Sequence, residues 1–390
     1  MQKLIFKEKL AELGMPQKEL ARRMGIHDSV LCRTLRQTEK GLSAKFLLDV
    51  ANIFCMDVKE FFSSREVPHS STFQDALISY PGGKSQELPI LTKLFPDEYD
   101  NFYDPFCGGG SVFLNAKPSN LYYINDLSVD LINLYNCIAQ QNELFLRTLD
   151  DFESHWQGYT ESWLNDIDVL YNSIPETLQF DKCILEKVAK KKFPFRNESQ
   201  VKGVLFHYYR GLFNNADSLD ISIPIKAVLF FIMRLFSFSG LIRYNKKGDY
   251  NSSYGASYNQ KSIKTYLDNY QSLAVQNIFN RTIIENMDFL EFLKKHEPDE
   301  NDFVFLDSPY DSSFSDYHNS SFTHDHHERL ARWTINHCKS KFMVVINNTP
   351  FISGLYENRG FNIRYYNKSF KVNFRNRNKK EAEIMVITNY

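Results

Sequence analysis

A tetrapeptide, Asp307-Ser308-Pro309-Tyr310, carries the residue types with the clearest chemical use in this sequence. It directly follows the apolar run at residues 303–306, which has the composition of a buried strand in a parallel sheet. Ligands of open α/β sheets bind beyond the carboxyl ends of such strands. We therefore expect chemistry here, and the four residues of the tetrapeptide are the candidate catalytic residues.

The tetrapeptide is suited to holding an exocyclic amino group on a flat base. The carboxylate of Asp307 and the backbone carbonyl of Ser308 can each accept one hydrogen from the amine. Tyr310 can stack on the ring, and Pro309 stiffens the turn. Because a similar pattern also occurs in ordinary strand-to-loop turns, the neighbouring motifs decide its meaning.

A glycine-rich segment at residues 104–111 is the second candidate site element. Its glycines stand between a strand-like stretch and an apolar helical stretch, where they let the backbone approach a ligand closely. No Lys-Ser/Thr pair follows the last glycine, so an adenosine ligand without phosphates is favoured over a nucleoside triphosphate or a dinucleotide. The candidate cofactor-binding residues in this segment are Asp104, Phe106, Cys107, Gly108, Gly110 and Ser111.

An acidic residue follows the next predicted strand. Residues 121–124 have a strand pattern that ends at Asn125 and Asp126, ahead of a helical pattern at residues 131–138. An acid at the end of the second strand of a nucleotide-binding half holds ribose hydroxyls. Asp126 is the candidate for that contact.

A third segment, Tyr-Pro-Gly-Gly-Lys at residues 80–84, precedes the glycine loop. In order with the glycine loop, the Asn-Asp pair at 125–126 and the tetrapeptide at 307–310, it resembles the Dam-type (D12 class) adenine-N6 DNA methyltransferases. The resemblance runs from about residue 79 to the C-terminus. Four ordered motifs are far more specific than any one of them.

The resemblance implies an α/β fold, with a Rossmann-like sheet of the S-adenosylmethionine-dependent methyltransferases and a helical target-recognition insertion. It also implies methyl transfer from S-adenosyl-L-methionine to N6 of adenine in duplex DNA by base flipping. In that family the residues matching Tyr80, Lys84, Asp126 and Asp307 contact the cofactor. The further cofactor-binding candidates are Gly82, Gly83, Asp288 and Phe289.

Two parts of this resemblance are looser. Ser308 stands where the family usually has Pro, but the mechanism uses its main-chain carbonyl, so the acceptor is retained. The Asp288-Phe289 pair follows a strand-like stretch at residues 282–284 and resembles an acidic-aromatic pair near the adenine ring of the cofactor. Phe289 also fits the apolar face of the helix that follows.

The first 64 residues have a different character. Apolar positions recur there at helical spacing, and the short helices they predict resemble the Cro/repressor-type helix-turn-helix. The recognition helix would lie around residues 28–36 and offer Ser29, Arg33 and Arg36 to a major groove. A small helical protein-interaction module is the alternative.

A long insertion, rich in aromatics and helical patterns, separates two parts of the catalytic domain. The expected division is a helix-turn-helix domain at 1–64, a linker at 65–78, the catalytic domain at 79–141 and 282–390, and a target-recognition insertion at 142–281.

Within the insertion, residues 238–251 resemble the family's target-recognition segment. A glycine-bounded hairpin bearing Arg243 can reach a guanine edge with two hydrogen bonds, with Asn245 and Lys246 as supporting or phosphate contacts. Ser253 stands where the family often has Pro, which puts transfer of the family's usual DNA target to this chain in doubt.

The composition fits a cytoplasmic enzyme of more than one unit. The 390 residues are 43% hydrophobic, without a bilayer-spanning apolar stretch or a signal peptide. Six cysteines without CxxC spacing indicate reduced thiols rather than disulfides or zinc. The His-rich stretch at residues 323–327 is expected to cap a helix at Thr323 or Asp325 rather than to bind a metal.

The formal net charge of −1 does not itself indicate nucleic acid, but local basic runs, including the tract at 375–380, can face phosphates. Double-stranded DNA and a cognate restriction endonuclease are the expected partners, with no membrane and a monomer or weak dimer. Three alternatives stay open. They are an RNA or cytosine-N4 methyltransferase, a regulatory DNA-binding protein with a vestigial pocket, and a Rossmann-type oxidoreductase, which the tetrapeptide disfavours.

Overall fold

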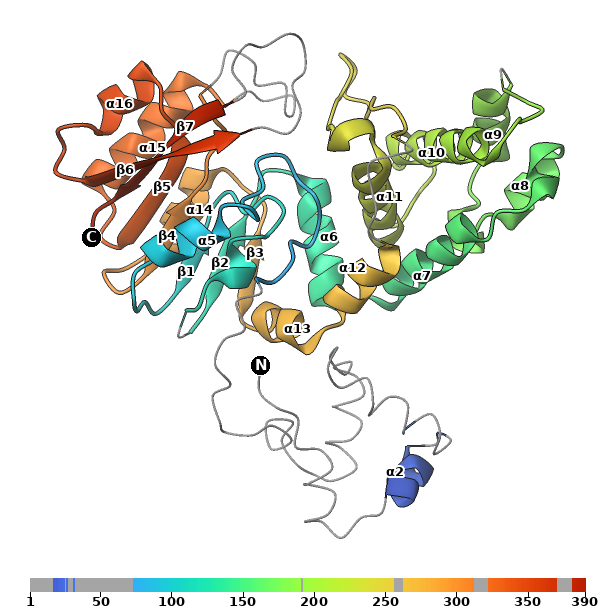
Figure 1. Cartoon of the computed structure of the whole chain (residues 1–390), viewed down its shortest axis with the longest axis horizontal. Helices are drawn as coiled ribbons and strands as arrows, with labels where there is room; N and C mark the ends of the chain where they lie inside the picture. Colours follow the sequence, from blue (N-terminus) through green and yellow to red (C-terminus); the bar gives the residue numbers. More distant parts are fainter. Residues whose placement is uncertain are drawn as a thin grey trace. The chain divides into compact units, whose positions relative to one another are not determined.

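The computed structural model describes residues 17–24, 26, 31, 73–118, 120–190, 192–255, 262–311, 322–369 and 381–390. The chain divides into two compact units, one of Met1–Gln74 with Asp268–Asn280 and one of Asp75–Leu267 with Arg281–Tyr390. The larger unit is a mixed α/β structure around one sheet (Figure 1). The α/β fold class predicted from the sequence is confirmed.

Within the described residues the sheet has seven strands. They are β1 (Phe102–Asp104), β2 (Tyr122–Asn125), β3 (Thr282–Glu285), β4 (Phe303–Leu306), β5 (Lys341–Asn347), β6 (Asn362–Ser369) and β7 (Glu381–Thr388), in the order β3-β2-β1-β4-β5-β7-β6. Strands β1 to β5 pair in parallel, and β7 runs antiparallel to β5 and β6. The strand order reverses between β1 and β4, the place where open parallel sheets bind ligands.

Two elements differ from the sequence predictions. The glycine loop is followed by a short 3₁₀ turn at Phe113–Asn115 instead of a helix. Pro118 and the start of β2 at Tyr122 leave no length for a helix there. The edge strand β6 was not predicted, because its sequence lacks an apolar run.

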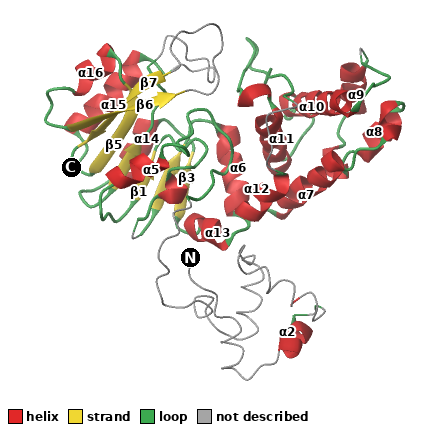
Figure 2. Ribbon diagram, viewed as in Figure 1, coloured by secondary structure: helices red, strands yellow, loops and turns green. Residues whose placement is uncertain are grey.

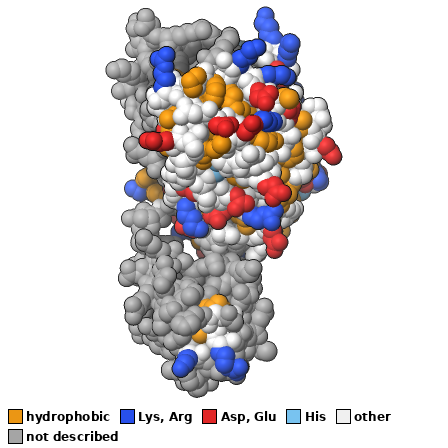
Figure 3. Space-filling model, turned by 90° about the vertical axis from the view of Figure 1, so that its right-hand side faces the viewer, with side chains coloured by type: hydrophobic (Ala, Val, Ile, Leu, Met, Phe, Trp, Pro, Cys, Tyr) orange, Lys and Arg blue, Asp and Glu red, His pale blue; other side chains and the backbone are white. Residues whose placement is uncertain are grey.

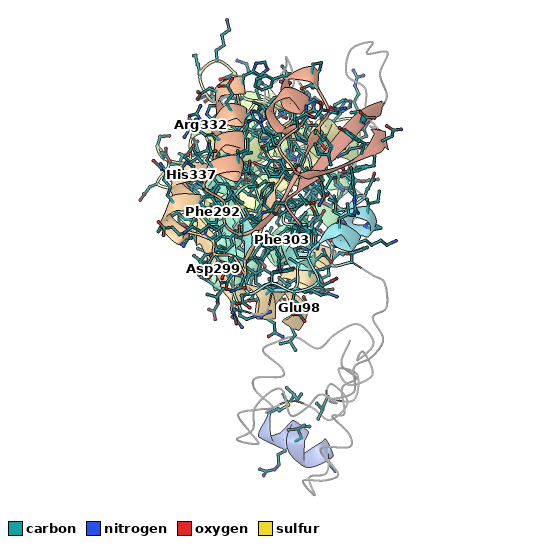
Figure 4. All side chains as sticks on the ribbon, turned by 90° about the vertical axis from the view of Figure 1, so that its left-hand side faces the viewer. Glu98, Phe292, Asp299, Phe303, Arg332 and His337 are labelled. Carbon is teal, nitrogen blue, oxygen red and sulfur yellow. The ribbon has the colours of Figure 1, made fainter. Side chains whose placement is uncertain are left out.

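Three helices cover one face of the sheet: α14 (Phe289–His296), α15 (His324–Asn336) and α16 (Pro350–Tyr356) (Figure 2). Their buried side chains form one core with β1, β4, β5 and β7. Figure 4 shows Phe292 of α14 in this layer, and Glu98 and Asp299 in the loops that enter β1 and β4. Each fully buried Phe or Leu contributes on the order of 1.5–3 kcal/mol, so the strand ends rest on a rigid layer.

The described part of the predicted insertion is mostly helical. Its helices are α7 (Glu143–Gln157), α8 (Ile167–Ser173), α9 (Lys182–Ala189), α10 (Glu198–Asn214), α11 (Ile223–Phe236), α12 (Ile263–Tyr270) and α13 (Leu273–Phe279). Helix α11 is apolar on most sides and packs against α6 (Val129–Ala139), α7 and α10. On the face seen in Figure 3, basic, acidic and hydrophobic side chains are interspersed, so charge alone does not mark a binding surface there.

The described part of residues 1–64 contains α2 (Gln17–Arg23), in which Leu20 and Ala21 are buried. Ser29, Arg33 and Arg36 lie outside the described residues, as does the basic tract at 375–380. Among the described helices, none has both the length and the apolar character that crossing a bilayer requires.

Candidate active site at the carboxyl edge of the sheet

An ion pair joins the first and last motifs of the sequence. Asp307 directly follows β4, and its Oδ2 lies 2.5 Å from Nζ of Lys84, a side chain that is only 1% exposed. The same ammonium donates to the carbonyl of Gly82 at 2.8 Å, and the backbone N–H of Lys84 donates to Oγ of Ser111 at 3.2 Å. The first segment, the glycine loop and the tetrapeptide therefore meet at one place.

Charges around Asp307 set its protonation. Burial raises the pKa of Asp307, while the Lys84 ammonium lowers it by attraction and by the hydrogen bond. Glu87 raises the pKa further and Lys368 lowers it. Since an opposite charge nearby favours the ionised form, the two lysines help to keep a carboxylate that can accept hydrogens.

The aromatic ring of Tyr310 has two ammonium groups close to it. Nζ of Lys84 lies 5.2 Å from the ring centroid and Nζ of Lys368 lies 5.7 Å from it, both within cation–π range. Ser308 is buried, and its hydroxyl finds no hydrogen-bond partner among the described residues, whereas Pro309 is exposed. The ammonium groups of Lys84 and Lys368 therefore hold the tetrapeptide at its tyrosine ring, and Lys84 also holds its aspartate.

A second ion pair beside the first was not predicted from the sequence. The buried carboxylate of Glu87 accepts from Nζ of Lys368 at 3.0 Å and from the hydroxyl of Tyr366 at 3.0 Å. Both partners lie on β6, the strand that the sequence pattern missed. Glu87 and Tyr366 are 279 residues apart, so no local signal connects them.

The glycine loop lies tightly against the segment before the first motif. Gly108 and Gly110 have φ of 47° and 81°, in the left-handed region that favours glycine. A side chain at Gly109 would come within 2.6 Å of the carbonyl oxygen of Ile78. The carbonyl of Gly109 also accepts from the N–H of Leu77 at 3.0 Å. The loop backbone thus approaches residues 77–78 closely, and its predicted approach to a ligand stays a prediction.

Predicted carboxylates from three strand ends gather here. Asp126, at the end of β2, accepts from the backbone N–H groups of Gly108 at 3.1 Å and Ser128 at 2.9 Å. Burial raises the pKa of Asp126 to about 6, although these hydrogen bonds oppose the shift. Burial also raises the pKa of Asp104 well above its usual range, and the charge of Asp307 adds to this.

Phe289 lies in the apolar core, as one of its two interpretations predicted, whereas the place of the Asp288-Phe289 pair beside the cofactor stays a prediction. Phe289 is a buried residue of α14, and its ring centroid lies 5.2 Å from that of Phe106 in the glycine loop. Asp288 caps α14 by accepting from the N–H of Leu290 at 2.9 Å. Nη2 of Arg329 also lies 3.3 Å from Oδ1 of Asp288. Phe289 is therefore both part of the core and a neighbour of the glycine loop.

The buried amide of Asn125, to which the sequence assigned no contact, ties the strand ends together. Nδ2 of Asn125 donates to the carbonyls of Pro105 and Met287, and its Oδ1 accepts from the N–H of Met287 at 3.0 Å. The loops after β1, β2 and β3 are thus held by a single side chain. The signal in the sequence was the apolar strand that ends in Asn-Asp, which indicated the neighbouring Asp126 as a site residue.

The predicted hairpin of the target-recognition segment is present. Tyr244 and Tyr250 form an antiparallel bridge, and Arg243 and Lys246 are exposed. The amide of Asn245 is used within the turn itself, where it accepts from and donates to the residues that follow. The structure thus gives Asn245 a part in shaping the hairpin, and its contact with DNA stays a prediction.

The His-rich stretch begins a helix, as expected. The N–H of Thr323 donates to Nδ1 of His326 at 3.1 Å in a capping box at the start of α15, which confirms Thr323 as the cap. Nε2 of His324 lies 3.1 Å from Oδ1 of Asp311. Across the described ranges, no three His, Cys, Asp or Glu side chains are grouped as a metal site would require.

Comparison with known proteins places the chain in a family. Residues 80–372 match the D12 class N6 adenine-specific DNA methyltransferases. The chain belongs to this family. It is 27% identical to the type II methyltransferase M.CviBI of Paramecium bursaria Chlorella virus NC1A, over 76% of this chain and 90% of that protein.

Two bacterial relatives of this D12 class methyltransferase are similar over comparable lengths. The type II methyltransferase M1.LlaDCHI of Lactococcus lactis subsp. cremoris is 25% identical over 80% of this chain and 94% of that protein. A DNA adenine methylase of Vibrio cholerae is 24% identical over 81% of this chain and 96% of that protein. The chain is thus an adenine-N6 DNA methyltransferase by family, with DNA as its substrate.

Proposed function

We propose that this chain transfers a methyl group from S-adenosyl-L-methionine to N6 of an adenine flipped out of duplex DNA. The observation that carries the proposal is the Lys84–Asp307 pair beside Tyr310, at the point where the strand order reverses. A duplex hides adenine N6, so the base must leave the stack to be modified. Stacking on Tyr310 would stabilise the extruded base by on the order of 1–3 kcal/mol.

The tetrapeptide would hold the amine with two acceptors. Oδ2 of Asp307 is taken by Lys84, which leaves Oδ1 for one hydrogen of the amine. The carbonyl of Ser308 would accept the second hydrogen. With both hydrogens held, the nitrogen lone pair points toward the cofactor side of the pocket. Asp307 also stabilises the positive charge that develops at N6.

The residues at the strand ends fit an adenosine ligand with a charged sulfur. The Asp126 carboxylate would accept hydrogens from the ribose hydroxyls, while Phe106 and Phe289 offer apolar faces to the adenine ring. Tyr80 and Lys84 border the same edge. Bound S-adenosylmethionine supplies an activated methyl group, whose transfer leaves the bonding electrons on sulfur and a proton on N6 to be lost to solvent.

DNA recognition is assigned to two separate segments in this proposal. The hairpin at residues 238–251, with exposed Arg243 and Lys246, would read the target within the insertion. Residues 1–64 would add a helix-turn-helix contact, and α2 supplies one of its expected helices. A footprint of the full chain on its own gene's promoter, compared with an Arg33→Ala/Arg36→Ala variant, tests this second contact.

A cognate endonuclease is a further proposed partner, because two relatives have type II names.

The test is transfer of tritiated methyl groups to DNA, followed by mass spectrometry of the nucleosides. The wild-type chain should produce N6-methyladenine, whereas N4-methylcytosine or labelled RNA would favour the alternative substrates. Asp307→Asn keeps the size of the side chain but removes the charge, and should abolish transfer. Asp150→Asn, on the exposed face of α7, is the matched control and should leave transfer unchanged. Full activity of Asp307→Asn would refute the proposal.

A further inference from the structure

Arg234 of α11 joins two segments that the proposed function assigns to different ligands. It is 1% exposed, and its Nη2 donates to the carbonyl of Ser79 at 2.8 Å. Its Nη1 donates to the carbonyl of Gly240 at 3.0 Å. Ser79 directly precedes Tyr80 and the first motif, and Gly240 stands at the base of the hairpin that carries Arg243. One planar side chain therefore holds both segments.

The guanidinium also contacts the first motif through an aromatic ring. The central carbon of the Arg234 guanidinium lies 5.5 Å from the ring centroid of Tyr80, within cation–π range. In the described part of the chain, Arg234 forms no ion pair with a carboxylate, and its Nε has no hydrogen-bond partner. A buried charge without a carboxylate costs free energy that an apolar side chain would avoid. Packing alone therefore does not account for an arginine here.

The hairpin has a second anchor that does not reach the first motif. Nη1 of Arg210, on α10, donates to the carbonyl of Ser252 at 2.7 Å, just beyond the hairpin. Gly240, at the Arg234 end, has φ of 61°, and this left-handed turn directs its carbonyl. The two arginines thus hold opposite ends of one hairpin, and Arg234 extends the connection to the first motif.

We propose that Arg234 is a positioning residue that couples the segment at 79–84 to the hairpin at 238–251, so that cofactor binding and DNA binding strengthen each other. The inference rests on the proposed function, which assigns the first segment to the cofactor and the hairpin to DNA. A ligand that orders one segment lowers the entropy that the other must lose. The coupling is reciprocal, since each ligand must raise the affinity for the other by the same factor.

The experiment measures this factor directly. The Kd for a duplex oligonucleotide that the wild-type chain methylates is determined with and without saturating S-adenosylhomocysteine, and the Kd for S-adenosylhomocysteine with and without the duplex. We expect a factor of about 5 or more for the wild type. Arg234→Lys, which cannot donate from a planar fork to two carbonyls, should bring the factor close to 1.

Arg210→Lys is the matched control, because it weakens the other anchor of the same hairpin. It should lower DNA affinity in the presence and absence of S-adenosylhomocysteine alike, and so preserve the factor. An unchanged factor in Arg234→Lys, or an equal loss in Arg210→Lys, would overturn the proposal. A wild-type factor of 1 would overturn it even if Arg234→Lys does not fold. Failure of the proposed function is seen separately, as a wild-type chain that labels no DNA.

Discussion

Two ion pairs, Lys84–Asp307 and Glu87–Lys368, meet around the ring of Tyr310. Each pair brings one lysine to the ring and one carboxylate to the same buried region. Glu87 raises the pKa of Asp307 and Lys368 lowers it, so the two members of the second pair shift this pKa in opposite directions. These opposing effects on the pKa of Asp307 require both members of the second pair to be present.

Removing Lys368 alone should therefore harm the enzyme more than removing Lys368 and Glu87 together. Lys368→Met leaves the Glu87 carboxylate uncompensated, which raises the pKa of Asp307 and moves the acidic limb of kcat/KM to higher pH. Adding Glu87→Gln should return the limb toward its wild-type position, with a coupling of about 0.5–3 kcal/mol in the double-mutant cycle. The pH dependence of methyl transfer for the four proteins is the measurement. A limb at the same pH in all four would show that Lys368 does not act through Asp307.

Asp126 predicts a pH dependence of cofactor binding. Its pKa of about 6 means that the carboxylate becomes fully ionised, and able to accept two hydroxyl hydrogens, only above that pH. Affinity for S-adenosylmethionine should rise between about pH 5 and pH 7, as calorimetry can show, and the rise should vanish in Asp126→Asn. An equal rise in the variant would assign the effect to another group.

The stability of the ligand-free chain should move in the opposite direction over part of this range. The pKa of Asp126 in the folded chain, about 6, exceeds the value of about 3.9 expected in the unfolded chain. The folded state then binds more protons between these values, so this residue's contribution to stability falls as pH rises through the window. Thermal unfolding of the wild type and of Asp126→Asn at pH 4 and pH 6 measures that contribution.

At the scale of elements, the sequence predicted the strands that a local pattern of apolar residues determines. The run at residues 303–306 is entirely buried as β4, and β2 and β3 lie where strand patterns were predicted at residues 121–124 and 282–284. Strand β6 was missed because it is a polar edge strand. The partners of Glu87, which are Tyr366 and Lys368, lie on this strand and were missed with it. Arg234 was missed because its partners are main-chain carbonyls, which no side-chain pattern reveals.

The glycine loop makes an element-scale prediction. Gly109→Ala forces the new methyl group against the Ile78 carbonyl, which is backbone and cannot rotate away. We expect a loss of about 1–3 kcal/mol in stability, together with weaker cofactor binding, because the loop must move away from the first segment. Gly354→Ala, in α16 with open space around it, should be neutral or stabilise the chain by up to about 1 kcal/mol. Chemical denaturation and calorimetry compare the two, and equal behaviour would mean that the close approach has no consequence.

At the scale of the whole molecule, charge does not provide a general attraction to DNA. The chain has a formal net charge of −1, and the face in Figure 3 mixes both signs. Phosphate contacts must then come from particular lysines and arginines, and the exposed turn of the hairpin offers Arg243, Lys246 and Lys247 together. Affinity and specificity should therefore be separable by single substitutions.

Arg243→Ala and Lys246→Ala should separate these two properties. Lys246→Ala removes a phosphate contact, so it should weaken binding to all duplexes alike and reduce the slope of log affinity against log salt by about 1. Arg243→Ala removes a base contact. It should therefore lower discrimination between a duplex that the chain methylates and an unrelated duplex by about 1–3 kcal/mol.

The measurement is a salt titration of binding to both duplexes. Lys294→Ala is the control, because Lys294 is exposed in the last turn of α14, on the approach to the amino end of β4 and away from the strand ends that hold the site. It should change neither slope nor discrimination. A uniform loss of affinity in Arg243→Ala, with discrimination intact, would assign this arginine to the phosphates and require base readout from another part of the insertion.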